Sequence, residues 1–396
     1  MNREDFPMLK NKYIYFNNAA TTFKPNVVLD VTKDFYLNHN SNLSRGIDSL
    51  SYYATNSFEE ARKVVANFIN ADSDEIVFTR GTTDSINMIA KFLECNVSKD
   101  DEIIISIIEH HSNFVPWQKI CERKNAKLIV LNIDNNGLID LDELKENINN
   151  KTKIVALNHV SNTFGGKNNL KEIANIVHQY DALFVVDGAQ GIINDVIDVK
   201  DTNIDFYTFS GHKLYGPMGV GVLYGKKEIL EKLEPTTYGG EMIDSVSIEK
   251  TTYKNSPYKF EAGTMMIPQV IGLATSIKYI NSIGLTNIHN HIKELRQYLI
   301  IRLKEIDNII IYNENNIDSS IVLFNIRGIH SHDIGSLLDK YNIIVRSGHH
   351  CAEPLMKYLN VDATLRVSLG LYNSKKEIDK LIEILMKAED FINELF

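Results

Sequence analysis

The stretch LFVVDGAQGIINDVIDVKDTNIDFYTFSGHKLYGPMGVGVLYG, residues 183–225, contains two polar clusters that each follow an apolar run. Residues 182–186 are wholly apolar, which indicates a strand buried on both faces of a parallel sheet, and DGAQ follows at 187–190. A second strand-like run at 204–209 leads into SGHK at 210–213. Because ligands of open α/β sheets bind at the carboxyl ends of strands, we predict that both clusters meet at one site.

Asp187 and Lys213 are the chemically informative members of these clusters. An Asp at the end of a buried strand is costly unless a cation or a hydrogen-bond donor meets it. Pyridoxal phosphate (PLP) needs a lysine for its Schiff base and a carboxylate that keeps its pyridine nitrogen protonated, so that the ring acts as an electron sink. The pair therefore favours a PLP site. A buried ion pair without a cofactor is the alternative that these two clusters leave open.

Composition restricts the class of protein. The hydrophobic content of 44% and the charged content of 23% are ordinary for a globular protein, and the net charge of −9 argues against a nucleic-acid partner. No apolar run approaches the ~20 residues of a membrane span, and the first ten residues have no apolar core of signal-peptide length. Three cysteines, Cys95, Cys121 and Cys351, are too few for a disulfide framework. We expect a soluble cytoplasmic protein with neither a membrane nor a nucleic acid as partner.

The order of the predicted elements indicates two domains, as does the length of 396 residues. Strands and helices alternate from residue 75 to about 225, which predicts a doubly wound α/β domain with a mainly parallel sheet. Residues 238–264 are polar and glycine-rich, and we expect them to be irregular. Strands and helices then predict a smaller α+β domain. We place the large domain at 17–268 and the small domain at 269–396 together with 1–16.

Polar residues follow other predicted strands as well. The sequence RGTTD at 80–84 lies between a strand and a helix, where N–H groups and hydroxyls hold a phosphate or simply cap the helix. In EHHSN at 109–113, a His can stack on an aromatic ligand, move protons or bind a metal. Asn162, in HVSN at 159–162, can donate to a ring hydroxyl or cap a turn.

The predicted small domain carries RSGHHCAEP at 346–354, where Gly and Pro bracket a loop that presents Cys351. A thiolate is favoured by positive or hydrogen-bonding neighbours and is the reactive form of cysteine. A structural cysteine is the plain alternative. A metal site of His349, His350, Cys351 and Glu353 is disfavoured, because adjacent residues rarely all point at one ion. Arg366, alone among apolar residues of a predicted strand, suggests a bound carboxylate, with a salt bridge as the alternative.

Together these motifs resemble the class V, fold-type-I PLP enzymes, and within them the group II (Suf-type) cysteine desulfurases. The resemblance covers nearly the whole chain in the same order of motifs. SGHKLYGP at 210–217 and RSGHHCA at 346–352 are its most specific strings, and the second separates group II from group I. Asn17 stands where the family often has Asp, and RGIDSLS at 45–51 varies. The other matching strings are NNAAT (17–21), RGTTDSIN (80–87), EHHSNFVPWQ (109–118), HVSN (159–162), DGAQ (187–190), FEAGT (260–264) and RVSLGLYNS (366–374).

The resemblance implies a role for each matching residue. Lys213 would bind PLP covalently and move protons, Asp187 would pair with the pyridinium, His110 would stack on the ring, and Cys351 would be the nucleophile. The phosphate ligands would be Thr82, Thr83, Ser210 and His212, with Thr264 supplied by the other subunit of a homodimer. Gln190 and Asn162 would contact the ring hydroxyl and the substrate region, and Arg366, Arg346 and Asn162 would bind the substrate.

The implied reaction is the PLP-dependent removal of sulfur from L-cysteine, which gives L-alanine and a persulfide on Cys351. A compact Cys loop cannot deliver sulfur far, so a Suf-type sulfur acceptor protein of iron–sulfur cluster assembly is the implied partner. The alternatives are a selenocysteine lyase, another class V enzyme such as an aminotransferase, a non-catalytic sulfur carrier or scaffold, and a metal-binding module at His349, His350 and Cys351.

Overall fold

The computed structural model describes residues 2–43 and 47–388. Its largest element is a seven-stranded sheet of order β2-β8-β7-β6-β5-β3-β4, in which all neighbours are parallel except β8, which is antiparallel to both β2 and β7. This is the predicted mainly parallel α/β sheet. Its strands are β2 (Ile76–Thr79), β3 (Glu102–Ser106), β4 (Lys127–Leu131), β5 (Thr152–Asn158), β6 (Leu183–Asp187), β7 (Phe206–Ser210) and β8 (Gly221–Gly225).

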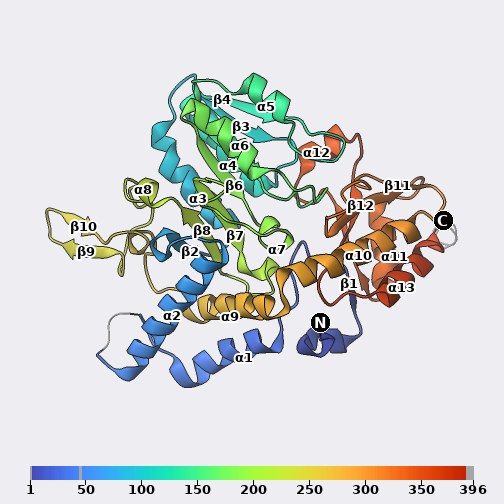
Figure 1. Cartoon of the computed structure of the whole chain (residues 1–396), viewed down its shortest axis with the longest axis horizontal. Coiled ribbons are helices and arrows are strands. Elements are labelled where there is room, and N and C mark those ends of the chain that lie inside the picture. The colour runs from blue at the N-terminus through green and yellow to red at the C-terminus, as the bar shows by residue number, and fades with distance from the viewer. Residues whose placement is uncertain (1, 44–46, 389–396) are drawn as a thin grey trace.

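Helices cover both faces of this sheet (Figure 1). Side chains alternate along the buried strands: Ile103 and Ile105 pack into one hydrophobic cluster, and Ile104 between them packs into the other. The first cluster takes in α3 (Thr82–Leu93), α4 (Val115–Lys124) and α8 (Lys227–Leu230). The second takes in α2 (Ser49–Phe68), α5 (Leu141–Asn147), α6 (Leu170–Val177), α7 (Gly191–Asn194) and α9 (Ile267–Ile283), while α1 (Asn26–Asp34) packs against α9.

A second, antiparallel sheet of order β11-β12-β15-β14 lies beside the large one, among the later helices (Figure 1). The N-terminal segment joins this part of the chain, because β1 (Ile14–Tyr15) pairs in parallel with β13 (Ile343–Ile344). These observations support our proposed division into two domains. The remaining elements are β11 (Ile309–Ile311), β12 (Ile321–Ile326), β14 (Arg346–Gly348), β15 (Thr364–Ser368), α10 (Leu285–Leu303), α11 (Ser331–Lys340), α12 (Glu353–Tyr358) and α13 (Lys375–Leu385).

The structure differs from the sequence-based prediction in one segment. Residues 238–264, expected to be irregular, contain an antiparallel hairpin of β9 (Ile243–Val246) and β10 (Thr251–Tyr253) that projects from the body of the molecule (Figure 1). Its strands are short and bury none of their side chains, so they lack the alternation of apolar and polar residues that signals a strand. Arg45–Gly46 and the final residues 389–396 of the predicted small domain lie outside the described residues.

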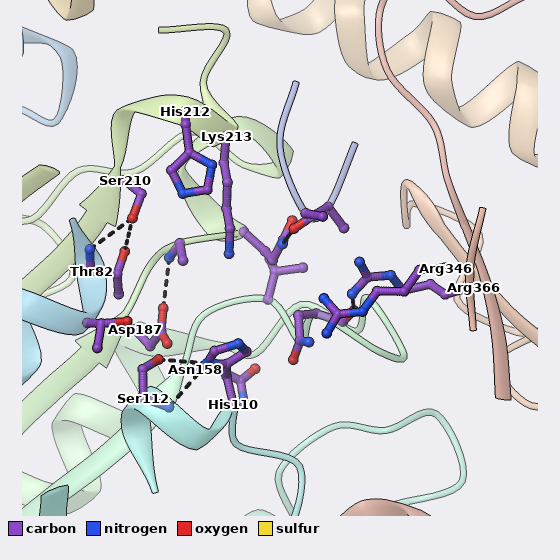
Figure 2. A pocket seen from close by; sticks show the side chains of 17 residues that line it. Thr82, His110, Ser112, Asn158, Asp187, Ser210, His212, Lys213, Arg346 and Arg366 are labelled. Atoms are coloured by element: carbon purple, nitrogen blue, oxygen red, sulfur yellow. Dashed lines mark hydrogen bonds between the residues drawn. The ribbon is translucent and has the colours of Figure 1, made fainter. Parts of the chain in front are cut away.

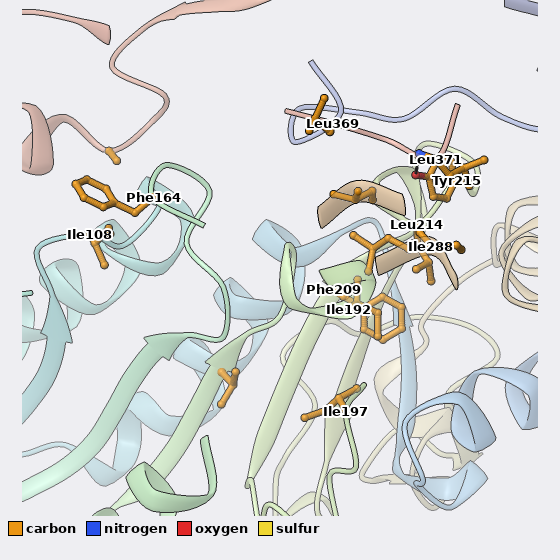
Figure 3. Packing of buried hydrophobic residues seen from close by; sticks show 14 of the residues in the cluster. Ile108, Phe164, Ile192, Ile197, Phe209, Leu214, Tyr215, Ile288, Leu369 and Leu371 are labelled. Carbon is orange, nitrogen blue, oxygen red and sulfur yellow. Dashed lines mark hydrogen bonds between the residues drawn. The ribbon is translucent and has the colours of Figure 1, made fainter. Parts of the chain in front are cut away.

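Hydrophobic packing fixes the turn that carries Lys213. Leu214 and Tyr215 follow it directly and are fully buried, and Figure 3 shows them grouped with Ile288 of α10 and with Leu371. The Tyr215 hydroxyl accepts a hydrogen bond from the Leu371 N–H at 3.0 Å. The lysine turn is therefore held from behind by residues far along the chain. Among the described residues, no helix is long and apolar enough to cross a membrane.

Candidate active site

The carboxyl ends of β5, β6 and β7 open into a cavity of about 220 Å³ (Figure 2). Its wall brings together the ends of five strands of the large sheet and two strands of the small one. Every site residue predicted from the sequence lines it except Cys351 and Thr264. The lining residues are Ala19, Ala20, Thr82, Thr83, His110, Ser112, Asn158, Val160, Asn162, Asp187, Ala189, Gln190, Ser210, His212, Lys213, Arg346 and Arg366.

Asp187 and Lys213 approach the cavity from neighbouring strands. Asp187 ends β6, is buried, and accepts a hydrogen bond from the Ala189 N–H at 2.9 Å. Burial raises the pKa of this carboxyl, and the charge of Lys213 partly opposes the shift. Burial also lowers the pKa of Lys213 to about 8, with Asp187 opposing and Arg366 adding to the effect. At pH 7 about a tenth of the Lys213 amine is therefore neutral, which is the form that a nucleophile or base requires.

Away from Asp187, the cavity is lined by a cluster of hydrogen-bonding groups that includes Thr82, Ser210 and His212. Ser210 Oγ lies 2.8 Å from Thr82 Oγ1 and accepts the Thr82 N–H at 2.8 Å, so one of the two hydroxyls has its proton free for a ligand. Gly81 has a φ of +153°, and a Cβ added at Gly221 would lie 2.4 Å from its Cα, so the backbone here is packed too tightly for side chains. Burial, with Lys213 and Lys24 nearby, lowers the pKa of His212 to about 4.

His110 forms the wall below Lys213 in Figure 2. Burial, followed by the charge of Lys213, lowers its pKa to about 3, so the ring is neutral. Its Nδ1 accepts the Ser112 N–H at 3.1 Å, which leaves the proton of the neutral ring on Nε2. Glu109 before it is fully buried and accepts hydrogen bonds from Ser106, Asn113 and the Asn158 side chain, each at 2.7 Å. Burial raises the pKa of Glu109 to about 7.

Two arginines occupy the side of the cavity that the small domain supplies. Arg346 and Arg366 are paired across β14 and β15, and Figure 2 shows them side by side. Arg366 is 1% exposed and donates to the Asn162 carbonyl at 2.8 Å and to Asn17 Oδ1 at 3.3 Å. Its buried Nε has no hydrogen-bond partner in the part of the chain that the structure describes. Burial, with Arg346 adding, lowers its pKa to about 9. Neither arginine forms an ion pair with a described carboxylate, so the pair is arranged for an anionic ligand.

Cys351 lies at the rim of the cavity. Its Sγ is 3.3 Å from Nη2 of Arg346, and its side chain is half-buried. The Asn162 side chain donates to the His350 carbonyl at 2.8 Å, which fixes the loop next to Arg366. His350 is buried and bonds through Nε2 to Thr364 Oγ1 at 2.8 Å. Among the described residues, no group of three His, Cys, Asp or Glu side chains could hold a metal ion.

Two predicted residues have other surroundings. Gln190 lines the cavity, but its Nε2 donates to the Ala19 carbonyl at 2.7 Å, so only its oxygen is available to a ligand. Thr264 is exposed and does not line the cavity of this chain. Its segment is anchored by Glu261, which pairs with buried Arg62 at 2.8 Å and accepts the Phe78 N–H of β2 at 2.8 Å.

Comparison with known proteins agrees with this arrangement. Residues 14–381 match the protein family described as aminotransferase class-V. The chain belongs to this family. A probable cysteine desulfurase of Halalkalibacterium halodurans is 44% identical over 398 residues, which cover 99% of this chain and 98% of the relative.

Two solved structures are similar over nearly the full length. The cysteine desulfurase CsdA of Escherichia coli, in an S-sulfonic acid form, is 37% identical with a TM-score of 0.93, and covers 98% of each chain. The apo cysteine desulfurase of Thermococcus onnurineus is 38% identical with a TM-score of 0.94, and covers 97% of this chain and 96% of that one. The predicted fold class is therefore confirmed.

The residues around the cavity fit PLP, the cofactor predicted for this class V chain. The buried Asp187 provides the carboxylate for a pyridinium, and the neutral His110 ring provides a flat wall. His212 Nδ1 is buried and has no hydrogen-bond partner among the described residues. It lines the same cavity as the Thr82 and Ser210 hydroxyls, and together these groups fit a phosphate. Lys213 would hold the cofactor covalently between these two ends.

Sequence reasoning missed several lining residues. Ala19 and Ala20 lie in a small-residue loop that, taken in isolation, favours a plain turn, and Asn158 is the last residue of a buried strand. Glu109 opens the EHHSN motif at 109–113, but the sequence assigns it no role. The signal that could have found Glu109 is a carboxylate at the carboxyl end of an apolar strand, the same pattern that identified Asp187.

We predict that PLP binds covalently to cofactor-free protein at a rate that rises with pH through about 8 and levels off above it. The reason is that only the neutral Lys213 amine reacts, and its pKa is lowered to about 8 from 10.5. Absorption of the bound cofactor after rapid mixing measures this rate. In Asp187→Asn the midpoint should move to lower pH, because the carboxylate that favours the protonated amine is gone. A midpoint near 10.5 in the wild-type protein would contradict the buried amine.

Proposed function

We propose that this chain is a PLP-dependent cysteine desulfurase of group II. The observation that carries the proposal is the position of Cys351. Its sulfur lies beside Arg346, which together with Arg366 closes the cavity that also holds Lys213 and Asp187. One site thus combines a cofactor-binding lysine, a subsite for a carboxylate and a thiol. The full-length relatives named cysteine desulfurase support the same activity.

L-Cysteine fits the cavity through its carboxylate. Arg366 is buried away from water, and its only polar contacts among the described residues are the neutral Asn162 carbonyl and the Asn17 side chain. A carboxylate would satisfy the unpaired Nε and restore the charge balance. Arg346 adds a second positive charge on the same side. The substrate would therefore be oriented with its carboxylate toward β14 and β15 and its side chain toward Cys351.

The reaction divides among the residues of this chain. PLP, when bound, supplies the electron sink that makes the Cα–H bond of the substrate acidic. Lys213, whose pKa is lowered to about 8, takes that proton and later returns it to the product. Asp187 would supply the negative charge that a protonated pyridine nitrogen needs. The His110 ring is neutral, because its pKa is lowered to about 3, and so it adds no charge to the site.

Cys351 then receives the sulfur. As a thiolate it attacks the substrate Sγ, so that an S–S bond forms while the Cβ–S bond breaks. The electron pair of the broken bond remains on carbon and is protonated, which gives L-alanine. Cys351 is left as a persulfide, and the atoms and electrons balance without an external oxidant. Arg346 places a positive charge 3.3 Å from the sulfur on which the negative charge is carried.

A Suf-type acceptor protein is the proposed recipient of the persulfide sulfur, for iron–sulfur cluster assembly. The support is the short loop of Cys351, which is held against the large domain by Asn162 and His111 and so cannot carry sulfur to a distant site. The cytoplasmic location stays part of the proposal. It is supported by three cysteines that are all free of disulfides.

A homodimer is the proposed assembly, with Thr264 of one subunit completing the phosphate site of the other. Thr264 is exposed in the single chain, outside the cavity. Large apolar side chains are also exposed along α1, α2 and the turn between them, among them Leu37 at 68% and Tyr52 at 71%. Such a surface is typical of an interface.

Selenocysteine lyase is the alternative within the same fold. Selenium leaves carbon more easily than sulfur, so a lyase needs no protein thiol. The contact between Cys351 and Arg346 favours the desulfurase. Another class V activity, such as an aminotransferase, would leave this thiol without a role.

We predict that wild-type protein loaded with PLP releases alanine from L-cysteine when an acceptor thiol is present, and that Cys351→Ala abolishes this release. The physical reason is that the thiol is the sulfur acceptor. The released alanine is measured directly. Cys121→Ala is the control, because it removes a buried cysteine that does not line the cavity. Equal alanine from Cys351→Ala would favour the lyase, and none from the wild type would favour another class V reaction.

We predict that Arg366→Gln raises the KM for L-cysteine by about tenfold to a hundredfold, since it removes charge-assisted hydrogen bonds to the carboxylate. Steady-state alanine formation measures KM. The matched control is Arg327→Gln, an exposed arginine of the small domain outside the cavity. A KM unchanged in Arg366→Gln would place the substrate carboxylate elsewhere.

We predict a mass of two chains by sedimentation equilibrium, because the exposed apolar surface needs a partner. Thr264→Ala should keep this mass while the dimer retains PLP less tightly in dialysis. A monomer that retains PLP as well as the family's dimers would contradict the shared site.

A further inference from the structure

The loop of Cys351 has a backbone conformation that the surrounding structure must impose. His350 has a φ of +56° and Cys351 a φ of +57°, two consecutive left-handed residues that are not glycine. Such a conformation is unfavourable for a residue with a side chain and persists only when neighbouring contacts determine it. We propose that His111 is the positioning residue that imposes this conformation and so aims the Cys351 sulfur at the substrate. The inference rests on the proposed desulfurase function.

His111 contacts the loop at two points, at Cys351 itself and just after it at Glu353. Its backbone N–H donates to the Cys351 carbonyl at 2.8 Å. Its ring Nε2 accepts the Glu353 N–H at 3.1 Å. Glu353 is the first residue of α12, and Ala352 before it has no side-chain cap, so the His111 ring serves as the acceptor for this helix end. His111 therefore holds the chain at the Cys351 carbonyl and again at the N–H of Glu353, two positions later.

The turn that carries His111 is itself fixed. The Asn113 N–H donates to the His110 carbonyl at 2.7 Å, and the Asn113 side chain donates to buried Glu109 at 2.7 Å. The Nδ1 of His110 accepts the Ser112 N–H. One rigid turn therefore presents His110 to the cavity and His111 to the Cys351 loop. This arrangement sets the distance between the sulfur and the cofactor site.

The ring acceptor is the part of this clamp that a substitution can remove. In His111→Ala the backbone N–H remains, and only the acceptor for Glu353 is lost. In His111→Gln the side-chain oxygen lies about as far from the backbone as Nε2 does, so it can accept the same N–H. Glu353→Ala is the matched control, because it keeps the backbone N–H and removes only an exposed carboxylate with its surface ion pair to Lys357.

The experiment uses the PLP-loaded enzyme and two independent measurements. The first is the rate at which iodoacetamide alkylates Cys351, without substrate. The second is kcat for alanine release, beside the L-cysteine Kd from the absorption of the cofactor. In His111→Ala, Cys351 should be alkylated faster and kcat should be lower, each by about two- to tenfold, which is the range for one hydrogen bond. Its Kd for L-cysteine should be unchanged, since Arg366 is intact.

Rescue decides the outcome. Recovery of both rates in His111→Gln, with Glu353→Ala like the wild type, would support the clamp. Wild-type rates in His111→Ala would overturn it, as would an equal loss in His111→Ala and His111→Gln. Should His111→Ala fail to fold, His111→Gln still tests the proposal, because the proposal requires its alkylation rate to equal that of the wild type. Alkylation needs no desulfurase turnover, so a failure of the proposed activity would be seen separately in the wild-type assay.

Discussion

The approach of Asp187 to Lys213 inside a buried cavity is the constraint on which the rest of the structure depends. Two ionisable groups out of water cost several kcal/mol each unless each has a counter-charge and hydrogen bonds. Here the Asp187 carboxylate accepts one backbone N–H, and the charge of the Lys213 amine acts on it. The pKa values of both groups are shifted so that their neutral forms are favoured. Such a pair needs a rigid frame. Strands β6 and β7 provide it because they are adjacent, parallel and buried on both faces.

The two sheets meet at this pair through a short N-terminal segment. Ala19 bonds through its N–H to Ser368 Oγ at 2.9 Å, and its carbonyl accepts from Gln190 at 2.7 Å. Three residues later, the Thr22 N–H donates to the His212 carbonyl at 3.0 Å, directly before Lys213. A loop of small residues thus connects β15 with the lysine turn, and the close approach of backbones explains why its side chains are small. The arginines of β14 and β15 are placed relative to Lys213 by these contacts.

Charge in the cavity is strongly unbalanced. Among the described residues that line the cavity, Lys213, Arg346 and Arg366 face one carboxylate, that of Asp187. The His110 and His212 rings are kept neutral by burial and by the neighbouring cations. The lowered pKa of Arg366 shows how costly this is for the protein alone. A phosphate and a carboxylate would restore the balance. The same electrostatics therefore fits the site both to the proposed phosphorylated cofactor and to the proposed amino-acid substrate.

Apolar runs and turn residues are local signals, so the amino-acid sequence is enough to predict the strands of the large sheet and the polar clusters at their ends. It also indicates the proposed chemistry, since Asp187, Lys213, Cys351 and Arg366 lie in recognisable motifs. Tertiary structure alone decided what depends on contacts between distant residues: the side-by-side arginines of β14 and β15, the left-handed backbone at Cys351, and the role of Glu109. The projecting hairpin of β9 and β10 escaped prediction for the opposite reason, since it buries nothing and so carries no pattern. Local residue order encodes the elements and their reactive groups, whereas the distances between those groups arise only when the two sheets pack together.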